Sequence, residues 1–178
     1  MPESISVTLD WSELTIAANV GVLRQVSSSA ARANCRATMN PWNIHIEGAA
    51  AECAVAKGLR QYWNLGGKAT QYTGDVGGME VKCTAHSNGG LLVPRHNDSS
   101  RIYILVTGTA PRYEIRGFLD GEDVMQPCYW NDALKIPAYL VPQADLYDIR
   151  FIDGLQQARH HARELIDVNE EIARQECQ

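Results

Sequence analysis

An apolar run from Ile102 to Thr107 places the tightest constraint on how this chain can fold. A continuous apolar run of this length, rich in β-branched residues, is typical of a strand that is buried on both faces. Residues 108–111 contain a glycine and a proline and predict a turn, and Tyr113–Phe118 predicts the returning strand. The sequence therefore indicates a β-hairpin at the centre of a sheet.

Length and composition favour one globular domain. The chain has 178 residues, of which 45% are apolar and 21% are charged, which is enough apolar material for a core and argues against disorder. No apolar run approaches the roughly 20 residues that a membrane span needs, and the N-terminus lacks the basic and apolar regions of a signal peptide. Five scattered cysteines without a C-x-x-C pair indicate reduced intracellular thiols. We therefore expect a cytoplasmic protein with no membrane partner.

The net charge of −5 limits the ways in which the chain could bind nucleic acid. It argues against a surface that is basic throughout. It is compatible with a local basic groove, because steering fields depend on where the charges lie. A cluster of acids at a metal site would also lower the net charge.

Helices are expected before and after the sheet. Asp10 can cap a helix, or two shorter ones, within Trp11–Ala33. Residues 40–43 interrupt the helical pattern, and a second helix is expected from Ile46 to Trp63. A charged helix is expected at the end of the chain. Its narrow apolar stripe, Leu155–Ile172, suits packing on its own domain or association with a partner helix, which would allow a homodimer.

Glu52 falls on the apolar stripe of the second helix, three residues after Ala49 and four before Ala56. A buried unpaired carboxylate costs several kcal/mol or shifts its pKa, so an acid at this position needs a partner. Two partners remain open. One is a bound cation, and the other is a salt bridge to Lys82 or to an arginine inside the fold.

A second group of charges lies between Asp75 and Lys82. Asp75 is placed at a Gly-rich turn, and Met79–Thr84 alternates apolar and polar residues as a strand does. Glu80 and Lys82 therefore point to the same face of that strand, beside the acid delivered by the turn. Two acids and an amine can hold a divalent cation with a fixed positive charge next to it, although an exposed Glu–Lys strand face would show the same alternation. The shorter elements expected elsewhere are strands at Ile5–Leu9, Leu91–Val93 and Pro137–Pro142 and an acidic helix at Leu119–Met125.

This arrangement resembles the PD-(D/E)XK nuclease superfamily. The resemblance rests on a helix with Glu52, the spacing D-x4-E-x-K from Asp75 to Lys82 and the apolar strand that follows. Gly74 stands where the family often has a proline. The resemblance implies an α/β fold of the α+β type, with a restriction-endonuclease-like core at about residues 46–146. That core is a central mixed β-sheet flanked by helices, with extra N-terminal and C-terminal helices, in one domain over residues 1–178. A softer resemblance is to phage-encoded or prophage-encoded nuclease-like proteins.

The resemblance also implies a hydrolase, a Mg²⁺-dependent DNA endonuclease in which Mn²⁺ can substitute; RNA stays open as a substrate. Asp75, Glu80 and the backbone carbonyl of Val81 would bind the metal, with Glu52 joining directly or through water. The metal would activate a water for in-line attack on phosphorus, and Lys82 would stabilise the charge that builds up on the phosphoryl group. The residues that could contact the nucleic acid are Thr84, His86, Arg95, His96, Arg101 and Gln143.

Two other classes of protein fit the same sequence. One is a catalytically silent module that keeps the nuclease fold and binds nucleic acid. The other is a phage structural or assembly protein whose C-terminal helix mediates self-association. The presence of Asp75, Glu80 and Lys82 together favours the enzyme, because an inactive copy is free to lose them.

Overall fold

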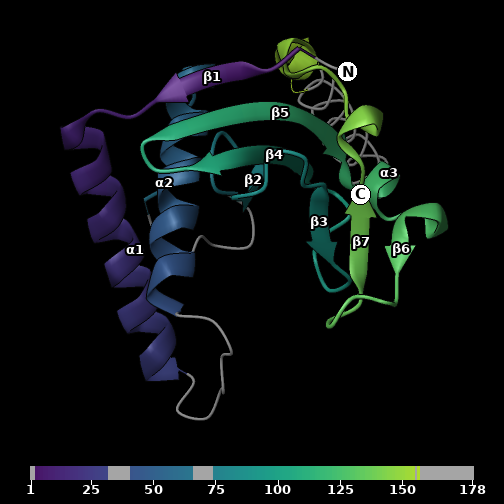
Figure 1. The fold of residues 1–178 in the computed structure, drawn as a ribbon, viewed down its shortest axis with the longest axis horizontal. Coiled ribbons are helices and arrows are strands. Elements are labelled where there is room, and N and C mark those ends of the chain that lie inside the picture. Colours follow the sequence, from purple (N-terminus) through teal and green to yellow (C-terminus); the bar gives the residue numbers. More distant parts are fainter. Residues whose placement is uncertain (1–2, 32–40, 66–73, 155, 157–178) are drawn as a thin grey trace, which may run out of the picture.

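The computed structural model describes residues 3–31, 41–65, 74–154 and 156. The central hairpin is present, formed by β4 (Ile102–Thr109) and β5 (Arg112–Asp120), which pair antiparallel. β1 (Ile5–Thr8) pairs antiparallel with β5, and β2 (Glu80–Thr84) pairs parallel with β4. The sheet therefore has the mixed order β1-β5-β4-β2, with β2 at one edge (Figure 1).

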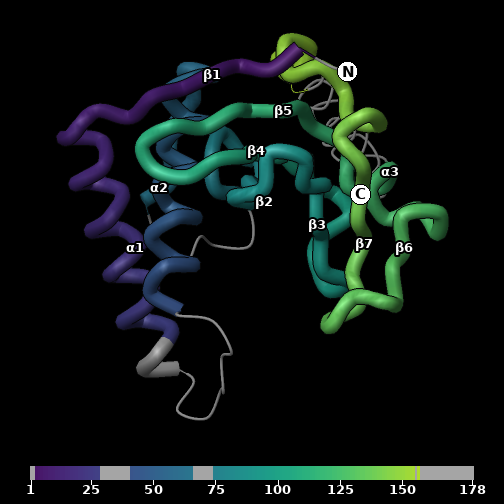
Figure 2. The backbone as a smooth tube through the Cα atoms, in the orientation of Figure 1, coloured from purple at the N-terminus to yellow at the C-terminus, as the bar shows by residue number. Residues whose placement is uncertain are grey.

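One face of this sheet is covered by α2 (Pro41–Leu59), and α1 (Trp11–Ala31) packs against α2. α1 is a single helix, and Asp10 caps it as predicted, because Glu13 N–H donates to the Asp10 carboxylate and Asp10 N–H donates to the Glu13 carboxylate. The tube in Figure 2 shows the two helices side by side, with α2 passing behind the hairpin and continuing below it.

The predicted bounds of the second helix were wrong at both ends. The helix begins at Pro41 instead of Ile46, because a proline is compatible with the first helical position, where its missing N–H has no helical partner to lose. It ends at Leu59 instead of Trp63, because Arg60 takes a left-handed conformation with φ of 55°. Residues 41–43, which were expected to interrupt the helix, therefore start it.

A second, antiparallel sheet covers part of the other face. Its order is β3-β7-β6, from β3 (Leu91–Pro94), β7 (Ala138–Val141) and β6 (Trp130–Asn131). The sequence did not predict this sheet. Two short helical turns, α3 (Gly121–Val124) and the 3₁₀ helix Pro127–Tyr129, connect the hairpin to this sheet. Two further 3₁₀ helices, Gln143–Asp145 and Ile149–Phe151, follow β7. The predicted acidic helix at Leu119–Met125 shrinks to α3, because β5 continues through Asp120.

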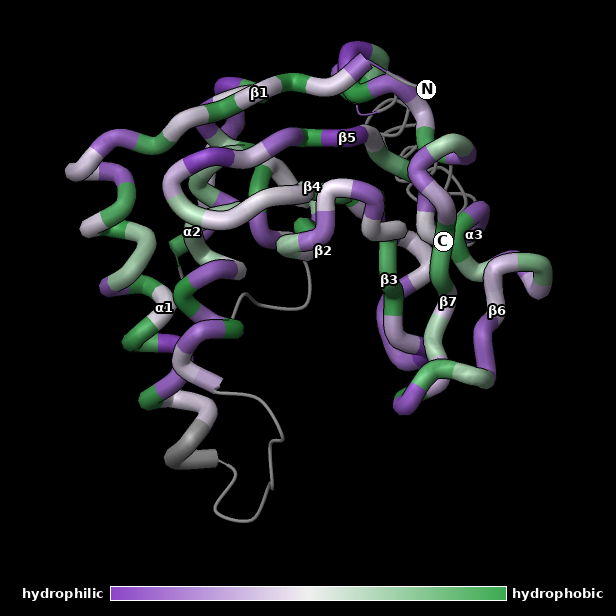
Figure 3. The backbone as a smooth tube through the Cα atoms, viewed as in Figure 1, coloured by the Kyte–Doolittle hydropathy of each residue, from purple (hydrophilic) through white to green (hydrophobic). Residues whose placement is uncertain are grey.

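The two faces of the first sheet carry two separate apolar clusters. Ile104, Val106 and Ile115 pack with Ala51 and Val55 of α2. On the opposite face, a smaller cluster joins the hairpin to the second sheet, and its buried members are Leu91, Val93, Tyr103, Leu105, Leu119, Val124, Val141 and Leu146. Figure 3 shows the matching alternation of hydrophilic and hydrophobic segments along β5. The protein is thus a mixed α+β fold, as predicted in that general form.

The described helices include none that is both long and apolar enough to cross a membrane. The C-terminal stripe Leu155–Ile172 lies outside the described residues, apart from Gln156, so the predicted partner helix stays a prediction. The same holds for the single domain expected over residues 1–178.

Candidate functional site

A tight turn built from glycines positions Asp75. Asp75 N–H donates to the carbonyl of Met79 at 2.7 Å, and Met79 N–H donates back to the carbonyl of Val76 at 2.9 Å. Gly74 adopts a φ of +55°, and a Cβ there would lie 2.5 Å from the carbonyl carbon of Gly78. A residue with a side chain would strain this turn, so glycine at 74 helps to place the acid.

The turn docks on the segment that follows α2. Asn64 N–H donates to the Asp75 carbonyl at 2.9 Å, and Gly77 N–H donates to the Tyr62 carbonyl at 2.9 Å. Trp63 pairs with Val76 in an isolated β-bridge. This docking brings the turn next to the helix that carries Glu52.

Asp75 lies on the free edge of the sheet. Its Oδ2 accepts the Val81 N–H at 2.9 Å, and β2 pairs with no strand on that side within the described residues. The N–H and C=O of one strand residue point to the same side, so the Val81 carbonyl faces the same free edge as the Asp75 carboxylate. The predicted carbonyl ligand and the predicted carboxylate ligand are thus brought together.

Glu80 and Lys82 lie on one face of β2, as the alternation predicts. Lys82 Nζ is 3.6 Å from Glu80 Oε2, and both side chains are about one quarter exposed, at 26% and 27%. Lys82 Nζ also lies 5.6 Å from the centre of the Tyr103 ring, which belongs to the neighbouring strand. The ring limits where the lysine can move and keeps the ammonium group near the acid.

Arg101 joins this group from the start of β4. Its Nη1 donates to the Gly78 carbonyl at 3.5 Å, and its Nε lies 3.5 Å from Asp98 Oδ2. Its positive charge acts on Glu80. Of the six residues proposed from the sequence to contact nucleic acid, Arg101 lies next to the acidic turn.

Burial and neighbouring negative charges raise the pKa of both Asp75 and Glu80. Burial, followed by the negative charge of Glu52, raises the pKa of Asp75, while the Val81 N–H and the charges of Lys82 and Arg24 act in the opposite direction. Burial, followed by the negative charge of Asp75, raises the pKa of Glu80. The positive groups of the chain therefore do not fully compensate this pair of carboxylates.

Glu52 has a different partner from the one that the resemblance implies. Arg24 of α1 donates to both of its oxygens, at 2.5 and 2.7 Å, and Trp63 Nε1 donates to Oε2 at 3.0 Å. The arginine alternative left open by the sequence is thus the one present. Glu52 still contributes negative charge at Asp75, but both of its oxygens already accept hydrogen bonds from the chain.

The other proposed nucleic-acid contacts are spread out. Thr84 lies on the Lys82 face of β2, and His86 is exposed in the loop after it, with its N–H donating to Thr84 Oγ1. Arg95 stacks 5.8 Å from the Trp130 ring in the second sheet, next to the exposed His96. Gln143 Nε2 donates to the carbonyls of Ser87 and Gly89, so it ties down the loop after β2. Their roles in binding stay predictions.

The sequence did not show which arginine pairs with Glu52, nor that Trp63 also donates to it. An arginine in a helix is most often exposed, yet the Arg24 side chain is only 16% exposed. One signal was present: Gly21 lies one turn before Arg24, and a Cβ at Gly21 would fall 2.5 Å from the Ile46 Cα. Such a close approach of α1 to α2 puts the arginine within reach of the second helix.

The donor set fits a magnesium ion only in part. Within the described residues, no group of three His, Cys, Asp or Glu side chains could hold a metal ion. Asp75, Glu80 and the Val81 carbonyl nevertheless offer hard oxygen ligands, and Mg²⁺ usually keeps several waters beside one or two carboxylates. A divalent cation would also compensate the two carboxylates that the chain leaves under-compensated.

Comparison of the chain with protein-family models, with curated proteins and with solved structures found no match in any of the three.

Proposed function

We propose that this chain is a metal-dependent nuclease that hydrolyses phosphodiester bonds of DNA in the cytoplasm of a bacterial or phage-infected cell. One observation carries the proposal. The Asp75 carboxylate is held on the free edge of β2 by the Val81 N–H, while Glu80 and Lys82 lie 3.6 Å apart on the same strand. Two under-compensated acids and an amine at one strand edge suit the handling of a phosphodiester and a cation.

Asp75, Glu80 and the Val81 carbonyl would hold the ion, either Mg²⁺ or Mn²⁺. When bound, it supplies charge compensation to the phosphate and a more acidic water. Glu52 would act through water, since Arg24 and Trp63 occupy its oxygens. Its negative charge would still favour a cation at Asp75.

Lys82 would orient the attacking water and offset the negative charge that builds up on the phosphoryl oxygens. Its ammonium group is compact and carries three donors, so it can serve an oxygen of the phosphate while it stays near Glu80. Arg101, between Asp98 and the Gly78 carbonyl, would add positive charge on the same side. The positive charges of Lys82 and Arg101 both come from the chain itself, and neither needs a rearrangement of the sheet.

The fold supports the same proposal at a coarser level. The strand with Glu80 and Lys82 runs parallel to the central strand β4, and α2, which carries the third acid, packs against the same sheet. We therefore propose a restriction-endonuclease-like core at about residues 46–146. The second sheet would be an elaboration of that core.

A second candidate is a nuclease-fold module that binds nucleic acid without cutting it. The Arg24–Glu52 pair favours this candidate, because it takes the oxygens of the third acid away from a metal. The retained Asp75, Glu80 and Lys82 favour the enzyme.

The test is incubation of the purified chain with linear, circular and branched DNA in Mg²⁺, in Mn²⁺ and in EDTA. We expect cleavage only with metal, and none in Asp75→Asn or Glu80→Gln. Lys82→Ala should lose about 100-fold or more in rate, the usual effect of removing one group that stabilises transition-state charge.

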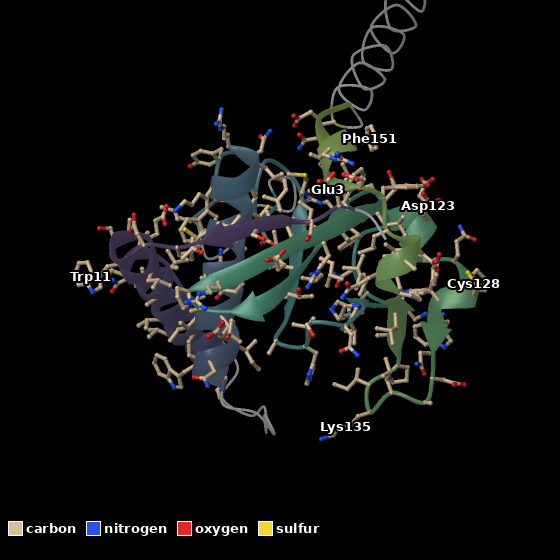
Figure 4. The ribbon with its side chains drawn as sticks, turned by 45° about the horizontal axis from the view of Figure 1, so that its top comes forward. Glu3, Trp11, Asp123, Cys128, Lys135 and Phe151 are labelled. Carbon is tan, nitrogen blue, oxygen red and sulfur yellow. The ribbon has the colours of Figure 1, made fainter. Side chains whose placement is uncertain are left out.

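Matched controls remove an exposed acid and an exposed lysine that are not part of the candidate site. The first control is Glu122→Gln, on α3. The second is Lys135→Ala, in the segment before β7, where Lys135 is labelled in Figure 4. Both should keep full activity. Full activity in Lys82→Ala would overturn the mechanism. Tight DNA binding with no cleavage in either metal would favour the silent module, and self-assembly without binding would favour a structural protein.

A further inference from the structure

The sheet face that carries Glu80 and Lys82 is only half covered. The second sheet packs against Tyr103, Leu105 and Leu119 at one end. At the other end, where α2 passes behind β4 and β5 in Figure 1, no described element lies in front of the strands. We call this end the polar face. Its accessible residues are Ser6, Thr84, Arg112, Glu114 and Arg116, and Thr107 lies buried beneath them at 1% exposure.

Strand register places these residues in one continuous array. Thr84 of β2 pairs with Thr107 of β4, which pairs with Glu114 of β5, which pairs with Ser6 of β1. Their side chains share a face, because Val106 and Ile115, which alternate with them, pack into the helix-side cluster. Lys82 lies two residues before Thr84 on that face, so the array continues into the candidate site.

A β-bulge turns Arg116 onto this face. The register of β4 and β5 shifts between Leu105 and Val106, where Leu105 pairs with Gly117 and Val106 pairs with Ile115, so Arg116 has no strand partner. Its Nε donates to Thr107 Oγ1 at 2.8 Å. Bulges re-aim side chains in this way, and they are over-represented near active sites.

The guanidinium of Arg116 keeps donors to spare. Only its Nε is engaged within the part of the chain that the structure describes, and no acid there forms an ion pair with it. Arg112 is exposed at the hairpin end of the same face. Glu114 is the one acid of the polar face, and the hydroxyls of Ser4 and Ser6 donate to its oxygens at 3.0 and 2.6 Å.

The polar face is therefore locally cationic in a chain whose net charge is −5. Arg112 and Arg116 outnumber Glu114, while the bordering Lys82 is offset by Glu80 at 3.6 Å. The accessible hydroxyls of the face are those of Ser6 and Thr84. Cations and hydroxyls in this mixture are the usual donors to phosphate oxygens. Because Lys82 and Arg116 lie on strands two apart, their backbones are separated by about 10 Å, so they can serve different phosphates of one strand.

We infer that the polar face binds the sugar–phosphate backbone of DNA next to the scissile bond, with Arg116 and Arg112 donating to phosphate oxygens. This inference rests on the proposed function, since it assigns the path of the substrate to and from Lys82. Binding through the backbone carries no base readout, so affinity should not depend on DNA sequence.

The test measures binding without cleavage. Fluorescence anisotropy of two labelled duplexes of unrelated sequence is recorded with the full chain in EDTA, at salt concentrations from about 50 to 200 mM. We expect Arg116→Gln to weaken binding by roughly tenfold on both duplexes and to reduce the slope of log affinity against log salt by about 1. Arg112→Gln, an exposed position that the fold tolerates, should act in the same direction. Lys135→Gln is the control of equal charge change and should bind as the unaltered chain does.

The outcomes separate this inference from the proposed function. If Arg112→Gln and Arg116→Gln bind both duplexes with unaltered affinity and slope while the chain still cleaves DNA in Mg²⁺, the inference is wrong and the nuclease stands. If both variants lose affinity but the chain cuts nothing in either metal, DNA binding by the polar face is supported and the proposed nuclease activity is wrong. Absence of binding by the unaltered chain would overturn the inference.

Discussion

Arg24 of α1 and Glu52 of α2 form a bidentate ion pair that joins the two helices. The side chains are 16% and 7% exposed, and both oxygens of Glu52 accept from the guanidinium. Burial lowers the pKa of Arg24, but the hydrogen bonds and negative charge of Glu52 outweigh that effect and raise it. Glu52, which the family resemblance implies as a metal ligand, thus forms an ion pair between the two helices next to the candidate site.

This pair predicts a large effect on stability. Arg24→Met should lower the free energy of unfolding by about 3–5 kcal/mol, because it leaves a buried carboxylate without its cation. The double variant Arg24→Met/Glu52→Leu should recover most of that loss, since apolar replacements of a buried pair are often neutral. Urea denaturation of the single and double variants measures both. A double variant as unstable as the single one would contradict this account.

Substitution of Asp75 or Glu80 should weaken metal binding more than substitution of Glu52 does. Titration calorimetry with Mg²⁺ should show that Asp75→Asn and Glu80→Gln abolish binding, because each removes a direct oxygen ligand. Glu52→Gln should weaken binding less, because Arg24 and Trp63 already hold its oxygens. Loss of binding in Glu52→Gln equal to that in Asp75→Asn would restore Glu52 as a direct ligand.

The raised pKa of Asp75 predicts a pH dependence of stability without metal. Between the ordinary carboxyl pKa and the raised value, the folded chain binds more protons than the unfolded chain. Its free energy of unfolding therefore falls as the pH rises through that window. Asp75→Asn lacks this contribution. Its free energy of unfolding, relative to that of the unaltered chain, should therefore rise with pH in EDTA. Chemical denaturation from about pH 4 to pH 8 measures the difference; a difference that stays flat or shrinks would contradict the burial of this carboxyl.

Two glycines should respond in opposite directions to substitution by alanine. Gly74→Ala should cost about 1–3 kcal/mol and reduce cleavage, because φ is +55° and the new Cβ would meet Gly78. Gly48→Ala should instead stabilise by about 0.5–1 kcal/mol, since it lies within α2 with no atom within 4 Å of the added Cβ. Thermal denaturation of both variants tests this, and a neutral Gly74→Ala would show that the turn can relax.

Local pattern was sufficient for the elements whose signals are local. The apolar run at Ile102 and the alternation at Glu80 and Lys82 predicted β4 and β2, and the Asp10 cap predicted the start of α1. Helix ends were less predictable. Pro41 can either break a helix or begin one, and the conformation of Arg60 depends on its surroundings.

The sequence by itself determined that Glu80 and Lys82 share a face, because side chains alternate along any strand, and that an acid at position 52 would need a partner, because burial penalises a lone charge. Only the tertiary structure decided who that partner is. Helix crossing at Gly21 brings Arg24 to Glu52, and strand order leaves the Val81 edge open for Asp75. The same folding sets Arg116 on the face of Lys82 through a bulge. These relationships join residues far apart in the chain, so no local pattern encodes them.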